Sequence, residues 1–156
     1  MNRGWRLFAV LCIAALDQGT KALALTQLSP DETLSVLPFL NLRISSNFGI
    51  AFGVLNSSQI NNWLVLAPVS GILLGFLYWL MLERQLGIIL GLSLIVGGAL
   101  GNVIDRLRQG AVTDFVDIFA GTYHWPTFNL ADTFLFCGVV IVLAYSVRNR
   151  SAHAGE

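Results

Sequence analysis

Four long runs of apolar residues dominate the pattern of hydrophobic and polar positions along the chain. Few charged residues interrupt these runs, which cover residues 7–25, 62–82, 87–104 and 130–147. A helix needs about 20 mostly apolar residues to cross the hydrocarbon core of a bilayer, so each run is predicted to be a membrane span. Only a few residues around Glu83 and Arg84 separate the second run from the third. We therefore expect these two helices to form an antiparallel hairpin.

The two longer connecting segments, 26–61 and 105–129, carry the period of β-strands. Leu40, Leu42 and Ile44 alternate with polar residues, which is typical of a half-buried strand, and residues 112–119 also fit an extended strand. The sequence thus predicts an all-α polytopic membrane protein, one membrane-embedded domain over 1–156. Its four transmembrane helices are accompanied by a small extracytoplasmic β-cradle.

Composition supports the membrane prediction. Hydrophobic residues make up 55% of the chain and charged residues 12%, about half the usual share, and the mean hydropathy is +0.70. A water-soluble domain of 156 residues could not bury so much apolar surface. The nine Lys and Arg balance the nine Asp and Glu, with no basic run, which argues against a nucleic-acid partner.

The arginines near the ends of the runs predict the orientation. Five fall on one side of the predicted membrane, namely Arg3, Arg6, Arg84, Arg148 and Arg150, whereas the other side has Arg43, Arg106 and Arg108. By the positive-inside rule, both termini are cytoplasmic and both long segments lie outside. Residues 1–24 also resemble a cleavable signal peptide, but Asp17 and Lys21 interrupt the apolar run, so we expect this segment to be retained.

Three pairs of glycines at four-residue spacing lie within the second and third runs. They are Gly71/Gly75, Gly87/Gly91 and Gly97/Gly101. Small residues at this spacing let helix backbones approach closely. We interpret each pair as a packing face.

Two pairs of polar residues inside the spans need an explanation, because a charge within a span is costly. Asp17 and Lys21 are four residues apart on one helix face, where they form either the polar wall of a site or an ion pair that only serves packing. Asn102 and Arg106 share a face in the same way and offer a docking surface for carbonyls or carboxylates. We interpret Asp105 as the point where the third span reaches water.

Two aspartates are predicted at the same outer depth. Asp114 lies on the strand face that carries aliphatic residues, whereas Asp117 faces the other way and is interpreted as a solvated or paired surface charge. Asn129 and Asp132 open the fourth span as an N-cap and an acidic first-turn residue. If Asp114 and Asp132 lie close together, they share a proton, as the two carboxylates of aspartic proteases do. We further hypothesise that Asp132, near a helix N-terminus, starts as the base and Asp114 starts protonated.

Other chemistries remain open at this point. The serines have no nearby His to activate them, but Asp114, Asp117, His124 and Asp132 could together hold a divalent ion. Asn47, within Asn47–Gly53, could bind a peptide backbone, and the glycines there suggest an irregular turn or strand end.

Four sequence blocks together resemble bacterial lipoprotein signal peptidase, also called signal peptidase II. The blocks are Asp17–Lys21, Asn47–Phe52, Gly101–Arg106 continuing to Gly110, Val112, Asp114 and Phe115, and Phe128–Asp132. Each block is weak alone, but the four in this order are specific to the family. None of their polar positions departs from its pattern.

The resemblance implies an aspartic endopeptidase of the bacterial inner membrane, with its active site at the outer leaflet. It would remove the signal peptide of prolipoproteins just before the diacylglyceryl-modified cysteine, without metal or cofactor, and the antibiotic globomycin would inhibit it. Asp114 and Asp132 correspond to the catalytic pair. The positions that line the site or bind substrate correspond to Asp17, Lys21, Asn47, Asn102, Arg106 and Asn129. The family fold has four transmembrane helices, an outer β-cradle and a short surface helix, and its mechanism requires only a monomer.

Two other classes of function stay open beside the peptidase. A small transporter or channel subunit could use Asp17, Lys21 and Asp132 as an ion relay, which predicts carboxylates spread through the bilayer depth. A non-catalytic assembly subunit would use the glycine faces to bind other helices. Proteolytic activity of the purified protein separates both from the peptidase.

Overall fold

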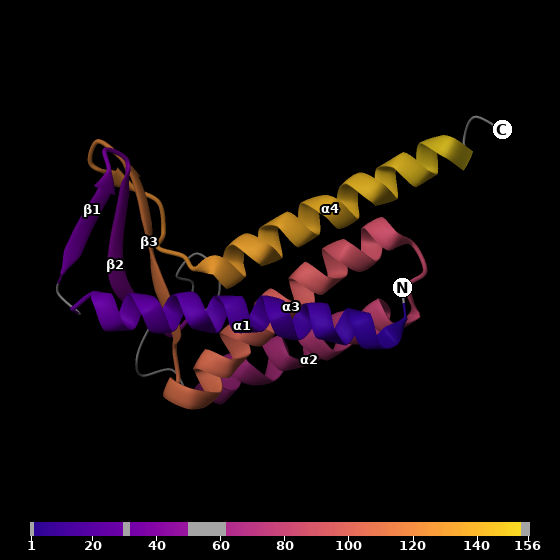
Figure 1. Ribbon diagram of the computed structural model, residues 1–156, viewed down its shortest axis with the longest axis horizontal. Helices are drawn as coiled ribbons and strands as arrows, with labels where there is room; N and C mark the ends of the chain where they lie inside the picture. Colours follow the sequence, from indigo (N-terminus) through magenta and orange to yellow (C-terminus); the bar gives the residue numbers. More distant parts are fainter. Residues whose placement is uncertain (1, 30–31, 50–61, 154–156) are drawn as a thin grey trace.

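Four long helices and a small antiparallel sheet make up the part of the chain that the computed structural model describes, residues 2–29, 32–49 and 62–153 (Figure 1). The helices are α1 (Arg3–Gln27), α2 (Asn62–Leu82), α3 (Leu86–Gln109) and α4 (Leu130–His153). Each is long and apolar enough to cross a membrane. The four predicted spans are therefore helical, and the predicted fold class is confirmed.

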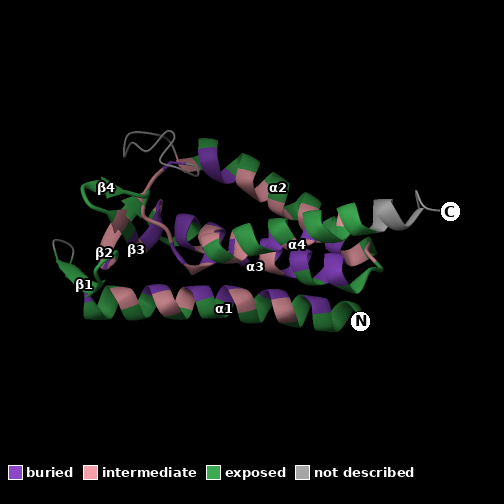
Figure 2. Ribbon diagram, turned by 90° about the horizontal axis from the view of Figure 1, so that it is seen from above, coloured by how far each residue is buried: buried purple, intermediate pink, exposed green. Residues whose placement is uncertain are grey.

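Helix α3 is the centre of the bundle, because α1, α2 and α4 all pack against it. More than half of its residues are buried, and Leu92, Ile95 and Val96 belong to the main apolar cluster. Exposed residues run along α1, α2 and α4 (Figure 2), and they include many Leu, Phe, Val and Trp side chains. Such surfaces are unstable in water but suit the hydrocarbon of a bilayer. The protein is a multi-pass membrane protein.

The sheet lies at one end of the bundle, and both chain ends lie at the other (Figure 1). Its order is β1 (Thr33–Leu37), β2 (Leu40–Asn47), β3 (Val112–Ala120) and β4 (Tyr123–His124), and every neighbouring pair is antiparallel. The strand predicted from the alternation at Leu40–Ser45 is thus β2. In the predicted turn, Asn47 is the last residue of β2, and residues 50–53 lie outside the described residues. The described ranges contain no additional short helix of the kind that the resemblance implies.

Glycine packing agrees with two of the three predicted pairs. A Cβ on Gly91 would lie 2.7 Å from Val142 and 2.8 Å from the Gly138 carbonyl, and one on Gly97 would lie 2.6 Å from Ile13. Gly87 and Gly101 likewise lie against Tyr145 and Asp17. The interpretation of Gly71/Gly75 is wrong, because open space surrounds both positions. Four-residue spacing shows which glycines share a face but not whether a neighbour covers that face.

The connection from α3 to β3 turns sharply at Gly110. This residue has a φ of 79° and its N–H donates to the Arg106 carbonyl at 3.1 Å, which ends the helix. Glycine suits this left-handed conformation because it has no Cβ. The turn directs the chain from the end of the central helix straight into the strand that carries Asp114.

Candidate active site

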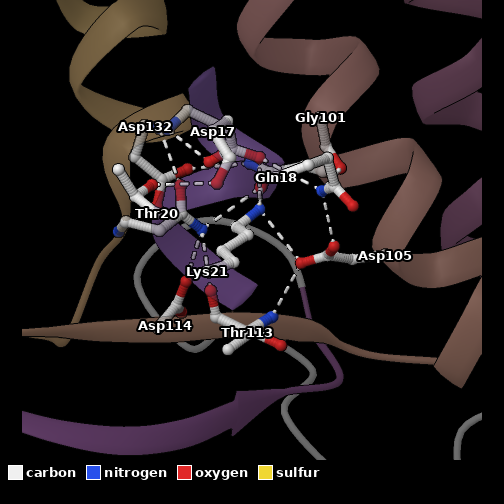
Figure 3. A network of polar contacts seen from close by, with 12 residues as sticks. Asp17, Gln18, Thr20, Lys21, Gly101, Asp105, Thr113, Asp114 and Asp132 are labelled. Atoms are coloured by element: carbon white, nitrogen blue, oxygen red, sulfur yellow. Dashed lines mark hydrogen bonds and ion pairs between the residues drawn. The ribbon is translucent and has the colours of Figure 1, made fainter. Parts of the chain in front are cut away.

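All eight predicted site residues gather where the helices meet the sheet. Figure 3 shows residues of α1, α3, β3 and α4 converging there. The hydrogen bonds and ion pairs described below connect Asp17, Lys21, Asn47, Asn102, Arg106, Asp114, Asn129 and Asp132 to one another or to shared neighbours.

Asp114 is buried in β3, with only 1% of its surface exposed. Its carboxylate accepts hydrogen bonds from the side-chain amides of Asn129 at 2.6 Å and Asn47 at 3.1 Å. Burial first, and then the negative charge of Asp132, raises the pKa of Asp114 to about 7. Asp114 therefore carries a proton for a substantial part of the time at neutral pH.

Asp132 lies in the first turn of α4, directly behind its cap. The Asp132 N–H donates to Asn129 Oδ1 at 3.0 Å, and the Asn129 N–H donates back to Asp132 Oδ2 at 3.3 Å. This reciprocal pair satisfies two N–H groups that a helix start leaves free, so the predicted N-cap is confirmed. The other oxygen, Asp132 Oδ1, accepts from Asn102 Nδ2 at 2.9 Å. Asp132 therefore caps the helix and still contacts the other predicted site residues. We refer to the eight residues named above as the polar cluster.

Backbone pairing brings the two aspartates together. Phe128 forms a bridge with Val116 of β3, through hydrogen bonds of 2.9 and 3.1 Å. Asp114 precedes Val116 by two residues, and Asn129 follows Phe128 immediately. The bridge therefore fixes the start of α4 against the strand, and Asn129 contacts both aspartates at once.

Asp17 and Lys21 form an ion pair of 2.8 Å and also take part in the site. The other Asp17 oxygen accepts the N–H of Ala131 at 2.9 Å, which adds a second cap to α4. Lys21 donates to Asn102 Oδ1 at 2.9 Å. The contacts with Ala131 and Asn102 go beyond a pair that only serves packing, and they favour the alternative of a polar wall, whose role in a site stays a prediction.

The interpretation of Asp105 as the end of the span in water is wrong. Asp105 is 5% exposed and lies 3.0 Å from Lys21 Nζ. Its carboxylate also accepts from Gln18 Nε2 at 2.8 Å and from the Thr113 N–H at 3.0 Å. Asp105, Gln18 and Thr113 are thus site neighbours that sequence reasoning missed. The signal for Asp105 was its position three residues after Asn102, on nearly the same helix face.

Arg106 donates hydrogen bonds to carbonyl groups, whereas the docking surface that it was predicted to form with Asn102 stays a prediction. Its guanidinium donates to the Phe48 carbonyl at 3.3 Å and to the Gly49 carbonyl, just beyond the end of β2. The bound carbonyls belong to the chain itself. Arg106 thereby holds the end of β2, and with it Asn47, beside Asp114.

A cavity of about 960 Å³ lies next to this polar cluster. Residues of α2, α3 and α4 line it, and Figure 2 shows α2 diverging from α3 and α4 towards the sheet. Most of the lining is apolar, with side chains such as Ile72, Phe76, Leu135 and Phe136. The polar side chains of Asn47, Asn102, Arg106 and Asp132 contribute to the lining as well. We refer to this cavity as the lateral groove.

Asp117 is buried, whereas the sequence predicted it at the surface. It is paired, as one of the two expectations had it, but only 1% of its surface is exposed. Its partners are Arg43 at 3.2 Å and His124 Nδ1 at 2.9 Å. Although burial acts to raise it, the His124 hydrogen bond and the Arg43 charge hold the pKa of Asp117 below its usual value.

This pairing also bears on the alternative of a metal site. Asp117 and His124 bind each other and Arg43, whereas Asp114 and Asp132 share Asn129. Within the described ranges, no three His, Cys, Asp or Glu side chains are grouped so that they could hold an ion. The four residues therefore do not form one ligand set.

Comparison with known proteins identifies the family of this chain. A family model described as signal peptidase (SPase) II matches residues 9–148. The lipoprotein signal peptidase of Francisella tularensis subsp. mediasiatica is 41% identical over 146 residues, which cover 90% of this chain and 89% of that protein. The protein of the same name from Blochmanniella pennsylvanica is 39% identical over 144 residues, or 90% and 87% of the two chains.

Two solved structures of bacterial membrane enzymes share the fold. One, at 2.3 Å resolution, has a TM-score of 0.80 and 29% identity, with 96% of this chain and 92% of the other covered. A second, at 1.9 Å resolution, has a TM-score of 0.77 and 31% identity, with 92% of each chain covered. Sequence, fold and the match over 9–148 agree: the chain belongs to the signal peptidase II family of membrane proteases.

Proposed function

We propose that this protein is an aspartic endopeptidase that removes the signal peptide from diacylglyceryl-modified prolipoproteins. It cuts just before the lipidated cysteine, and Asp114 and Asp132 are its catalytic pair. The substrate class comes from its relatives, which are named lipoprotein signal peptidases. The single observation that carries the proposal is that Asn129 forms hydrogen bonds with both aspartates beside an apolar groove.

The different surroundings of the two carboxylates support different roles. Asp114 is buried and its pKa is raised to about 7, so it starts protonated and donates to the carbonyl oxygen of the scissile bond. Asp132 lines the lateral groove at the N-terminus of α4. It starts ionised and accepts a proton from the attacking water. When the tetrahedral intermediate collapses, the C–N bond breaks and Asp132 passes the proton it took from water to the leaving amine nitrogen. A hydroxyl of the intermediate returns a proton to Asp114 as the C=O bond re-forms, which restores both carboxyl groups.

The shape of the lateral groove suits a lipid-borne substrate. Its apolar lining between α2 and α4 offers a place for the hydrophobic segment of a signal peptide. Its polar residues hold the peptide backbone, with Asn47, Asn102 and Arg106 as hydrogen-bond donors. Because substrate and enzyme share one membrane, lateral diffusion brings them together, and positioning supplies much of the rate.

We place the site at the outer leaflet of the bacterial inner membrane, with both termini in the cytoplasm. The basis is the excess of arginines at the end of the bundle that holds the termini. The enzyme acts as a monomer without a metal or cofactor, and globomycin-type compounds inhibit it by occupying the groove. An ion relay would require carboxylates at several depths of the bilayer, whereas Asp17, Asp105, Asp114 and Asp132 meet at one end.

The test is cleavage by the purified protein in detergent or bilayers. The substrate is a prolipoprotein that carries diacylglycerol on its cysteine, and the matched control is the same polypeptide without lipid. We expect cleavage of the lipidated form alone, with mass spectrometry placing the new N-terminus at the modified cysteine. Equal cleavage of both forms, or a cut elsewhere, would contradict the proposed specificity. No cleavage of either form would contradict the enzyme itself.

A further inference from the structure

Lys21 is a buried cation whose hydrogen-bonding capacity is fully used. Only 2% of its surface is exposed, and its ammonium group lies 2.8 Å from Asp17, 3.0 Å from Asp105 and 2.9 Å from Asn102 Oδ1. A lysine ammonium has three N–H donors. Each donor has an acceptor here, so none is left to turn towards Asp114 or Asp132.

Asp105 joins three elements of the fold. It lies on α3, pairs with Lys21 of α1, and accepts the N–H of Thr113, the residue that precedes Asp114 in β3. Gln18 donates to its other oxygen at 2.8 Å. The Asp105 carboxylate contacts Lys21, Gln18 and the Thr113 N–H, so it acts on the reaction through Lys21 and the strand rather than by touching substrate.

Several charges face Lys21 from the elements around it. Asp17 comes from α1 and Asp105 from α3, both in direct contact, and Asp114 of β3 and Asp132 of α4 lie within electrostatic reach. Arg106 adds a second cation near the same carboxylates. The Lys21 charge acts to lower the pKa of Asp114, against the larger effect of burial. A closer approach of Lys21 to Asp114 would therefore make that carboxyl lose its proton more readily.

We propose that Asp105 is a positioning residue that holds the Lys21 ammonium, together with the Thr113 backbone, away from the catalytic pair. This inference rests on the proposed function, in which Asp114 has to be protonated to act as the acid. With Asp105 replaced by Asn, the amide oxygen still accepts from Lys21 but no longer attracts it with a negative charge, and the ammonium shifts towards the carboxylates of Asp114 and Asp132 within its electrostatic reach. Asp114 then loses its proton at a lower pH, and the enzyme loses its acid.

The pH dependence of kcat/KM tests this positioning role. We compare purified wild type with Asp105→Asn, an isosteric change that removes one negative charge, on lipidated prolipoprotein between about pH 5 and pH 9. The basic limb of the profile should move to lower pH by about half a unit to one unit, the effect of one charge at intermediate distance. A limb that stays in place while the variant remains folded overturns the proposal.

Two matched variants separate charge from structure. Asp105→Glu restores the negative charge and should return the basic limb to within about 0.2 units of wild type. Gln18→Leu removes the 2.8 Å hydrogen bond to Asp105 without changing any charge. Its rate can fall, but its basic limb should not move. A shift in Gln18→Leu as large as that in Asp105→Asn overturns the proposal, because a structural disturbance would then explain both.

If circular dichroism and thermal unfolding show that Asp105→Asn does not fold, Lys21→Gln provides the test instead, and the expected shift of the basic limb has the opposite direction. Without the cation, the basic limb should move to higher pH, and an unmoved limb overturns the inference. The outcomes also distinguish the two proposals. If the wild-type protein fails to cleave the substrate, the proposed function is contradicted. If the wild type cleaves it and the basic limb of the variants does not move, only the role of Asp105 is contradicted.

Discussion

Asn129 donates a hydrogen bond of 2.6 Å to the Asp114 carboxylate while its own side-chain oxygen accepts from the N–H of Asp132 and caps α4. A single residue thus couples the strand that carries one aspartate to the helix that carries the other. It is completely buried, and its backbone N–H completes the cap by donating to Asp132 at 3.3 Å. The geometry of the proposed catalytic pair depends on this amide.

Replacing Asn129 with serine should separate the two roles of this residue. A serine hydroxyl is also a good N-cap, so the helix should start normally and the melting temperature should change little. Serine cannot also donate to Asp114, and losing a buried hydrogen bond to a charged group should reduce kcat/KM by about tenfold to a hundredfold. The assay is cleavage of lipidated prolipoprotein beside thermal unfolding. Wild-type activity in the folded variant would show that the amide is not needed.

The pH–rate profile should be bell-shaped. The proposed mechanism requires Asp132 ionised and Asp114 protonated, so activity should fall above neutral pH as Asp114, whose pKa is raised to about 7, loses its proton. The acidic limb reports the first proton lost by the coupled pair, and both midpoints belong to the pair as a unit. The measurement is kcat/KM between about pH 4 and pH 9. Activity that stays constant from pH 6 to pH 9 would contradict an acid role for Asp114.

Stability should depend on pH in opposite ways for Asp114 and Asp117. Asp114 has a raised pKa, so the folded state binds its proton more tightly than the unfolded state does. The contribution of Asp114 to the free energy of unfolding is fully present below pH 3.8, its usual pKa, and is lost as pH rises through about 7. The loss amounts to at most about 4 kcal/mol. The melting temperature of Asp114→Asn should therefore rise relative to that of wild type as the pH increases from about 5 to about 8.

Asp117 provides the matched comparison, because its pKa is lowered. Its contribution is present above 3.8, its usual value, and is lost as pH falls through the lower folded pKa. Asp117→Asn should accordingly melt below wild type at pH 7, and the difference should shrink in acid. Melting curves of both variants at several pH values check the two signs. The same trend in both variants would contradict the assignment of raised and lowered pKa values.

Glycines in contact with another helix should respond differently from glycines that face lipid. A Cβ on Gly98 would lie 2.5 Å from the carbonyl oxygen of Ala131, in the first turn of α4. Gly98→Ala should therefore displace this turn, cost about 1–3 kcal/mol and reduce cleavage at least about tenfold. Gly75→Ala is the control, since that position meets open space. It should be neutral or stabilise the helix by up to about 1 kcal/mol. Equal effects of both variants on melting temperature and activity would contradict the packing account.

The membrane spans could be predicted from the sequence because their cause is local. Each span is a run of about 20 apolar residues, a property that needs no knowledge of the neighbouring helices. The same holds for the strand at Leu40–Ser45 and for Asn129 as a helix cap, where alternation and residue type carry the information. The gathering of the predicted site residues was inferred from the resemblance and from their shared depth. Their functional roles stay predictions.

The errors concern relations between segments that are distant in the chain. Asp105 looked like the end of a span because nothing near it in the sequence shows that Lys21 lies across from it, 84 positions earlier. Asp117 looked exposed because Arg43 and His124 come from other strands. The exposure of Gly71 and Gly75 follows from which face of α2 meets α3, which periodicity alone does not determine.

The central claim, that two aspartates catalyse the cleavage, is tested most directly by removing each carboxylate in turn. Purified wild type, Asp114→Asn and Asp132→Asn are compared on diacylglyceryl-modified prolipoprotein, with thermal unfolding to show that each variant is folded. We predict that each substitution lowers kcat by at least about a hundredfold, because a general acid or base is lost. Robust cleavage by either folded variant would contradict a mechanism that requires both carboxylates.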